Sequence, residues 1–108
     1  MRKLSRKKDQ RKALLRSLAE SLILQEKIQT TEAKAKELRP YIEKLVTKAR
    51  KNTLASRRDL LKLFDNNIVN KLNQISQKYL TRQGGYTRII KLTPRQTDSA
   101  QIAIIEFV

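Results

Sequence analysis

Apolar residues recur at steps of three and four near the start of the chain, behind a polar first segment. These residues are Leu14, Leu15, Leu18, Ala19, Leu22 and Ile23. Such spacing places them on one face of an α-helix, so the pattern predicts a helix over about residues 10–24. The β-prone run Ile28–Thr31 follows and predicts one short strand.

A second helical stripe runs from Ala35 to Ala49 and predicts a helix over about residues 32–50. Thr31 is a candidate N-cap, because its hydroxyl can accept a hydrogen bond from an unpaired amide of the first turn. Pro40 lies inside this stretch and lacks an amide hydrogen, so we expect one kinked helix. The end of the helix carries cations that complement its dipole: Lys48, Arg50 and Lys51.

Two more helices are predicted before the chain reaches its two glycines. One covers about residues 54–64 behind the candidate cap Thr53. We expect its inward face to consist of Leu54, Leu61 and Phe64. The next helix carries apolar residues at helical steps and ends before Gly84 and Gly85; these residues are Ile68, Leu72, Ile75 and Tyr79. Because glycine tolerates a positive φ, the glycine pair predicts a tight reversal.

The pattern changes its period after the glycines. Thr87–Thr93 and Gln101–Phe107 are short and rich in β-branched residues, which predicts two strands joined by a polar loop. A bare hairpin is marginal in water, so helices must cover one face, and the strand near Ile28 can extend the sheet. The chain is therefore predicted to be an α+β domain of two layers, in the order helix, strand, three helices, two strands.

Charge narrows the function. The chain has 25 Lys and Arg against 10 Asp and Glu, a net charge of +15 and a pI of about 10.6. A polyanionic partner would relieve the resulting repulsion, and nucleic acid is the commonest such partner. Seven of the basic residues lie in the first twelve positions, where apolar residues are few. We expect residues 1–12 to form a disordered basic arm ahead of a single RNA-binding domain over residues 13–108.

Catalysis and metal binding are not expected. The chain contains no His and no Cys, which removes the commonest general base and the thiolate ligands of zinc. No nucleotide-binding or nucleophile motif is present. We therefore expect no enzyme activity, no catalytic residue, no cofactor and no metal. No run approaches the ~20 apolar residues of a membrane span and no signal segment is evident, which favours a cytoplasmic protein without membrane contact.

Two groups of basic residues are candidate RNA contacts. The first lies on the arm and first helix: Arg2, Lys3, Arg6, Lys7, Lys8, Arg11, Lys12 and Arg16. The second lies around the glycines, where no acid occurs between Asp65 and Asp98: Lys78, Arg82, Arg88, Lys91 and Arg95. Tyr86 lies among them, and its ring would either stack on an unpaired base or pack against the sheet. No array of base-reading residues is evident, which favours contacts to phosphate and recognition of RNA shape.

Five blocks occur in a characteristic order: Arg11–Arg16, Ile28–Thr31, Ala33–Pro40, Arg82–Leu92 and Ala103–Val108. In this order and over essentially the whole chain, they resemble the bacterial large-subunit ribosomal protein seventeen family. The resemblance implies a structural protein, one copy per ribosome, that binds large-subunit ribosomal RNA near the peptide tunnel exit beside neighbouring ribosomal proteins. It also implies that the arm reaches into the RNA. The chain departs from the family near its start, where a common histidine is missing.

Two other classes stay open if the resemblance is set aside. A DNA-binding architectural protein would share the charge, although no helix with base-reading side chains is evident. A membrane-surface protein would share the amphipathic first helix with its basic end. That helix lacks Trp, and its apolar face is better explained as core. Sedimentation with ribosomal subunits, nucleoid or membranes distinguishes the three classes.

Overall fold

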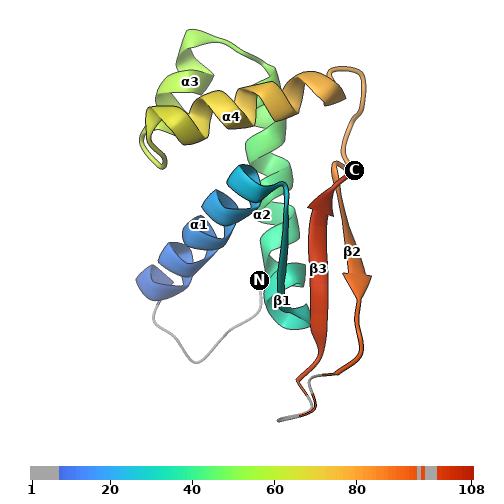
Figure 1. Ribbon diagram of the computed structural model, residues 1–108. Coiled ribbons are helices and arrows are strands. Elements are labelled where there is room, and N and C mark those ends of the chain that lie inside the picture. Colours follow the sequence, from blue (N-terminus) through green and yellow to red (C-terminus); the bar gives the residue numbers. More distant parts are fainter. Residues whose placement is uncertain (1–7, 95, 97–99) are drawn as a thin grey trace.

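The computed structural model describes residues 8–94, 96 and 100–108 (Figure 1). The helical elements are α1 (Lys8–Gln25), α2 (Glu32–Arg50), α3 (Leu54–Leu61), α4 (Asn66–Ser76) and the 3-10 turn η1 (Gln77–Tyr79). The strands are β1 (Lys27–Thr31), β2 (Thr87–Lys91) and β3 (Ile102–Phe107). This order confirms the predicted α+β class and the predicted succession of elements.

Side-chain caps explain where the helices begin. The Thr31 hydroxyl accepts a hydrogen bond from the amide of Lys34 at 3.3 Å, which confirms it as the N-cap of α2. Thr53 and Ser56 form a reciprocal capping box at the start of α3. Asp65 caps α4 through a bond to the amide of Ile68 at 3.0 Å. α2 continues through Pro40, so the proline does not divide it.

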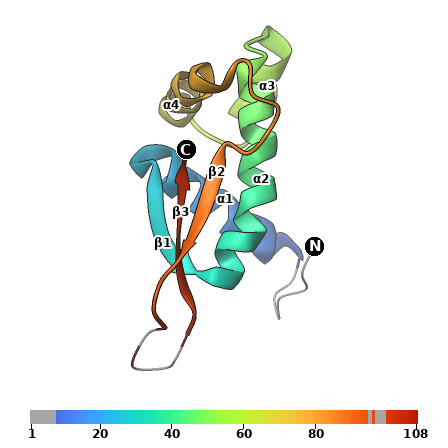
Figure 2. The same cartoon turned by 90° about the vertical axis from the view of Figure 1, so that its right-hand side faces the viewer.

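The three strands form an antiparallel sheet in the order β1-β3-β2. Ile28, Ile105 and Ile89 are aligned across the strands, and all three belong to the core or pack against it. α2 contacts every strand. In Figure 2, α1 and α2 lie on the same side of the sheet. Helices therefore cover one sheet face, and the strand near Ile28 extends the hairpin, as the sequence predicts.

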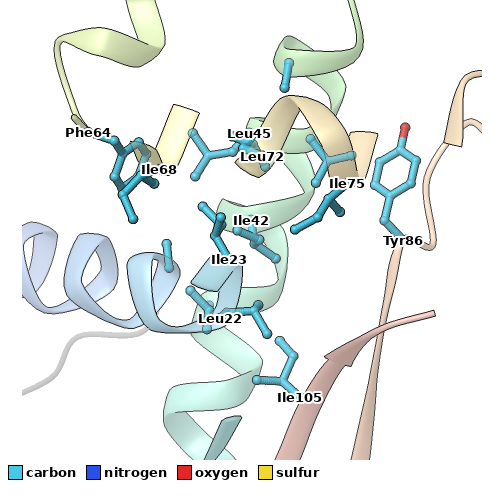
Figure 3. Close-up of a cluster of buried hydrophobic side chains, with 14 of the residues drawn as sticks. Leu22, Ile23, Ile42, Leu45, Phe64, Ile68, Leu72, Ile75, Tyr86 and Ile105 are labelled. Atoms are coloured by element: carbon cyan, nitrogen blue, oxygen red, sulfur yellow. The ribbon is translucent and has the colours of Figure 1, made fainter. Parts of the chain in front are cut away.

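One cluster of buried apolar side chains joins the helices to the sheet (Figure 3). It includes Leu22 and Ile23 of α1, Ile42 of α2, Leu72 of α4 and Ile105 of β3. α2 contacts α1, α3 and α4 as well as the sheet. Since three helices and all three strands contact α2, this helix is held firmly in the fold. The side chains on its outer surface are therefore held in fixed positions relative to the core.

The structure corrects the predicted inward face of α3. Leu54 and Leu61 are exposed by 68% and 39%, whereas Ser56, Leu60 and Phe64 are buried. The buried positions are four residues apart and follow from the phase that the Thr53 cap imposes on the helix. Only Phe64 of the predicted face was correct, and it lies beyond the end of α3.

The structure also moves the start of the first helix. α1 begins at Lys8, so residues 8–12, which were predicted as part of the arm, are helical. Asp9 lies in the first turn, where a carboxylate interacts favourably with the helix dipole.

Candidate nucleic-acid interface

A carboxylate from α2 holds the turn that precedes β2. Gly84 and Gly85 have φ values of 123° and 65°, which confirms the predicted reversal. Oε1 of Glu43 accepts a hydrogen bond from the amide of Gly85 at 2.9 Å. Its Oε2 accepts bonds from the amide and the hydroxyl of Thr87 at 3.1 and 2.9 Å. The turn is thus fixed to α2, and these two amides are already occupied by an acidic group.

Tyr86, predicted as an RNA contact, is 1% exposed. Its ring centroid lies 5.2 Å from that of Tyr79 and 5.8 Å from the guanidinium carbon of Arg50. Its hydroxyl donates to the carbonyl of Arg82 at 3.1 Å. A ring enclosed in this way is not free to stack on a base in this structure. The structure therefore favours the second of the two interpretations, in which Tyr86 packs inside the fold as a core residue.

Arg50 and Arg82 hold the segment before the glycine turn. Nη1 of Arg50 donates to the carbonyls of Tyr79, at 3.2 Å, and of Arg82. Nη1 of Arg82 donates to the carbonyl of Gly85 at 3.1 Å, and its guanidinium lies over the Tyr79 ring at 5.9 Å. Arg50 was predicted only to compensate the helix dipole, and its hydrogen bonds to this segment were not predicted. Arg82 is exposed but is committed in part to the fold.

Arg88 and Lys91 lie on β2 with exposed side chains, but each has an acidic partner. Arg88 pairs with Glu106 at 3.1 Å and Lys91 with Glu32 at 3.3 Å. Hydrogen bonds from Lys36 and then Lys91 lower the pKa of Glu32 below its ordinary value. The basic side chains are 60% and 68% exposed, so solvent screens both pairs. A phosphate can therefore compete for either cation.

The first predicted basic group is described only in part. Lys8 and Lys12 are exposed on α1, and Arg11 and Arg16 are half-buried there. The other predicted contacts lie outside the described residues: Arg2, Lys3, Arg6, Lys7 and Arg95. The second group is also described only in part, since Arg95 lies outside the described residues.

Two surface hollows lie along the outward side of α2 and share one residue, Lys44. The α1–α2 hollow, of about 420 Å³, is lined by Lys12, Leu15, Arg16, Glu37, Pro40, Tyr41, Lys44 and Leu63. The glycine hollow, of about 290 Å³, is lined by Glu43, Lys44, Thr47, Lys48, Lys51, Gly84 and Tyr86. Because Lys44 lines both hollows, they form one continuous surface. That surface extends from the basic half of α1 to the glycine turn.

Cations border both hollows and form what we term the basic ridge: Lys12, Arg16, Lys44, Lys48 and Lys51. Lys48 pairs with Asp59 at 3.6 Å. The other four are in no ion pair with the residues that the structure describes. Unpaired cations beside a hollow are suited to phosphate, because the protein already leaves their charge uncompensated.

Three lysines of the ridge, in α2 and at its C-cap, were not predicted as RNA contacts. Lys44, Lys48 and Lys51 follow at steps of four and three, which is a detectable stripe at helical spacing. The last two were expected to compensate the helix dipole, and nothing in the local sequence places them beside Gly84. That neighbour comes from a segment more than 30 residues further along the chain.

No group of three His, Cys, Asp or Glu residues that could hold a metal ion occurs in the described part of the chain. None of the described helices is long and apolar enough to cross a membrane.

The family model for ribosomal protein L17 matches residues 14–108. The chain belongs to the ribosomal protein L17 family. This membership confirms the resemblance drawn from the sequence blocks. It also makes the chain a structural ribosomal protein rather than an enzyme, as the sequence predicts.

Curated relatives named "Large ribosomal subunit protein bL17" match along almost their full length. The relative from Natranaerobius thermophilus is 55% identical over 109 residues, covering 99% of this chain and 96% of the relative. The relative from Aster yellows witches'-broom phytoplasma is 56% identical over 114 residues, covering 98% and 97%. The relative from Staphylococcus haemolyticus is 50% identical over 119 residues, covering 99% and 97%.

Proposed function

We propose that the chain is a structural constituent of the large ribosomal subunit and binds ribosomal RNA through the basic ridge. The observation that carries this proposal is the set of unpaired cations around two hollows that share Lys44. The names of the relatives support the large subunit as the site of action. The net charge of +15 supports a polyanionic partner.

The basic ridge is suited to binding a phosphate backbone in a defined position. Lys44 and Lys48 project from α2, and Lys51 is the residue that caps its C-terminal end, so one packed helix sets their spacing before the RNA binds. Each phosphate that they neutralise releases condensed counterions, which favours binding at low salt. Contacts to phosphate fix the orientation of the protein on the RNA but do not depend on the base sequence. The protein therefore recognises its binding site by the three-dimensional shape of the RNA.

The remaining predicted contacts extend this surface. Lys8 and Lys12 continue it along α1 towards residues 1–7, whose basic side chains we propose also contact RNA. Arg82, Arg88 and Lys91 would meet RNA on the other side of the glycine turn, the last two by exchanging their carboxylate partners for phosphate. The family resemblance further supports one copy per ribosome, near the peptide tunnel exit and beside other ribosomal proteins.

Charge reversal on the ridge tests the proposal. The full-length variant Lys44→Glu with Lys51→Glu replaces two unpaired cations by anions that repel phosphate. We expect its incorporation into large subunits, measured by sedimentation and quantitative mass spectrometry, to fall well below that of the wild type. Its melting temperature should stay close to the wild-type value, because both lysines lie at the surface of α2.

A control with the same charge change is Arg58→Glu with Lys62→Glu, in α3 and at its C-cap; Lys62 makes only a long, exposed ion pair with Asp59, at 3.9 Å. Both residues are exposed and outside the two hollows, and the change in charge is the same. We expect nearly normal incorporation of this control. Equal incorporation of the two double variants would show that the ridge is not a principal RNA surface.

A further inference from the structure

The α1–α2 hollow combines apolar walls with a buried acidic residue, Glu37, in its lining. Leu15, Pro40 and Leu63 provide apolar surface, and Tyr41 adds a half-buried ring. Its volume of about 420 Å³ falls within the roughly 300–1,000 Å³ of small-ligand pockets. A set of lysines that contacted only phosphate would not need such a concavity.

Glu37 is the unusual residue of this hollow. It is 8% exposed, and its Oε1 atom is buried without a hydrogen-bond partner among the described residues. The cations of the rim do not form ion pairs with it. A buried polar group without a partner destabilises the free protein. The missing hydrogen bonds point to a donor supplied by a ligand.

We propose that the α1–α2 hollow receives one unpaired guanine base of the ribosomal RNA; this inference rests on the proposed function. Guanine presents two adjacent donors, N1–H and N2–H, and the carboxylate of Glu37 offers two acceptor oxygens. Adenine, cytosine and uracil each present only one donor group on that edge. Bases that are splayed out of single-stranded RNA are recognised through this edge and through stacking on aromatic rings, and Tyr41 supplies the ring.

The surrounding charges favour RNA over other occupants. Lys12, Arg16 and Lys44 border the hollow and would hold the phosphates on either side of the inserted base. The same three cations would repel a lysine or arginine from a basic neighbouring protein. Arg16 acts on Tyr41 directly: burial raises the pKa of the Tyr41 hydroxyl, and the Arg16 charge opposes that effect. The ring and the rim cation are therefore close neighbours.

The test uses large subunits from cells that carry the wild type, Glu37→Gln or Glu26→Gln as their only copy of the full chain. A reagent specific for N1 and N2 of unpaired guanine, and dimethyl sulfate for adenine and cytosine, are applied to the subunits. We expect one guanine that the wild type protects to become roughly fivefold or more reactive with Glu37→Gln, as loss of a two-bond base contact implies. Glu26→Gln is the control. Glu26 lies outside the hollow and pairs only with Lys71 and Lys78 among the described residues, so the same change in charge there should leave the wild-type pattern.

The outcomes are separable from those of the proposed function. Absence of the wild-type chain from large subunits would defeat the proposed function itself. Normal occupancy by Glu37→Gln with an unchanged guanine pattern would overturn only the guanine inference, as would a gain in reactivity at an adenine or cytosine alone. Tyr41→Leu provides a second variant if Glu37→Gln does not fold. It keeps an apolar wall but removes the ring, and it should expose the same guanine.

Discussion

Two carboxylates on α2 show how one residue type serves different purposes within two turns of helix. Glu43 accepts three hydrogen bonds, from Gly85 and Thr87, and fixes the start of β2. Glu37 is more deeply buried but its Oε1 has no such donor in the described structure. Glu43 therefore stabilises the fold, whereas the buried Oε1 of Glu37 destabilises it. Substitutions at the two positions should therefore change stability in opposite directions.

Glu43→Gln should lower the free energy of unfolding by about 1–3 kcal/mol, because an amide nitrogen would face amide and hydroxyl donors that are left unsatisfied. Urea unfolding of the purified protein measures the change. Glu20→Gln, on the surface of α1, is the control for the loss of one negative charge. A Glu43→Gln protein as stable as this control would show that the three bonds contribute little.

Glu37→Met should raise the free energy of unfolding by about 1–3 kcal/mol, since a flexible apolar side chain replaces a buried group whose Oε1 has no partner. Thermal and urea unfolding of the isolated protein provide the measurement. A lower stability than the wild type would mean that Glu37 contributes to the fold, and its unsatisfied oxygen would then not indicate a binding role.

At the scale of elements, α2 performs two tasks on two faces. Its inner face packs against the sheet and the other helices, and its outer face carries Lys44 and Lys48 of the basic ridge, with Lys51 at its C-cap. Its last turn adds a third task, because Arg50 donates to the carbonyls of Tyr79, at the end of η1, and of Arg82, before the glycine turn. The geometry of the ridge beside Gly84 depends on this attachment.

Arg50→Lys separates the attachment from dipole compensation, because charge is kept while the planar guanidinium is lost. We expect stability to fall by about 1–2 kcal/mol and amide hydrogen exchange at Gly85 and Thr87 to accelerate. Lys51→Arg, one residue further along, should change neither quantity. If exchange is unaltered in Arg50→Lys, the residue acts only through its charge.

For the whole molecule, the basic charge determines how strongly RNA binds, whereas the buried core determines the fold and its stability. Among the described residues, the buried apolar cluster extends from Leu15 to Ile105. The first seven positions of the sequence contain only two apolar residues, Met1 and Leu4, and so offer little surface for a core. Those seven positions contain four basic residues, Arg2, Lys3, Arg6 and Lys7. Binding strength and folding stability should therefore be separable by truncation. The start of α1 at Lys8 gives the appropriate boundary for it.

Removal of residues 1–7 should leave the melting temperature close to the wild-type value. It should weaken binding to large-subunit RNA and flatten the plot of log K against log salt, by ~0.7–0.9 for each phosphate contact that is lost. Titration of fluorescent RNA at several salt concentrations measures the slope. An identical slope for the truncated and full-length proteins would show that these residues make no phosphate contact.

The sequence by itself determined the order of the elements, the caps at Thr31 and Thr53, the glycine reversal and the polyanionic class of partner. Each depends on local periodicity, on a side chain bonding its own backbone, or on total charge, and none requires distant contacts. Only the tertiary structure decided that Tyr86 is buried, that Arg50 holds the glycine segment and that Lys12 and Lys44 border one hollow. Glu43 and Gly85, for example, are 42 residues apart. The enclosure of a side chain depends on such remote partners, and periodicity along the chain does not specify them.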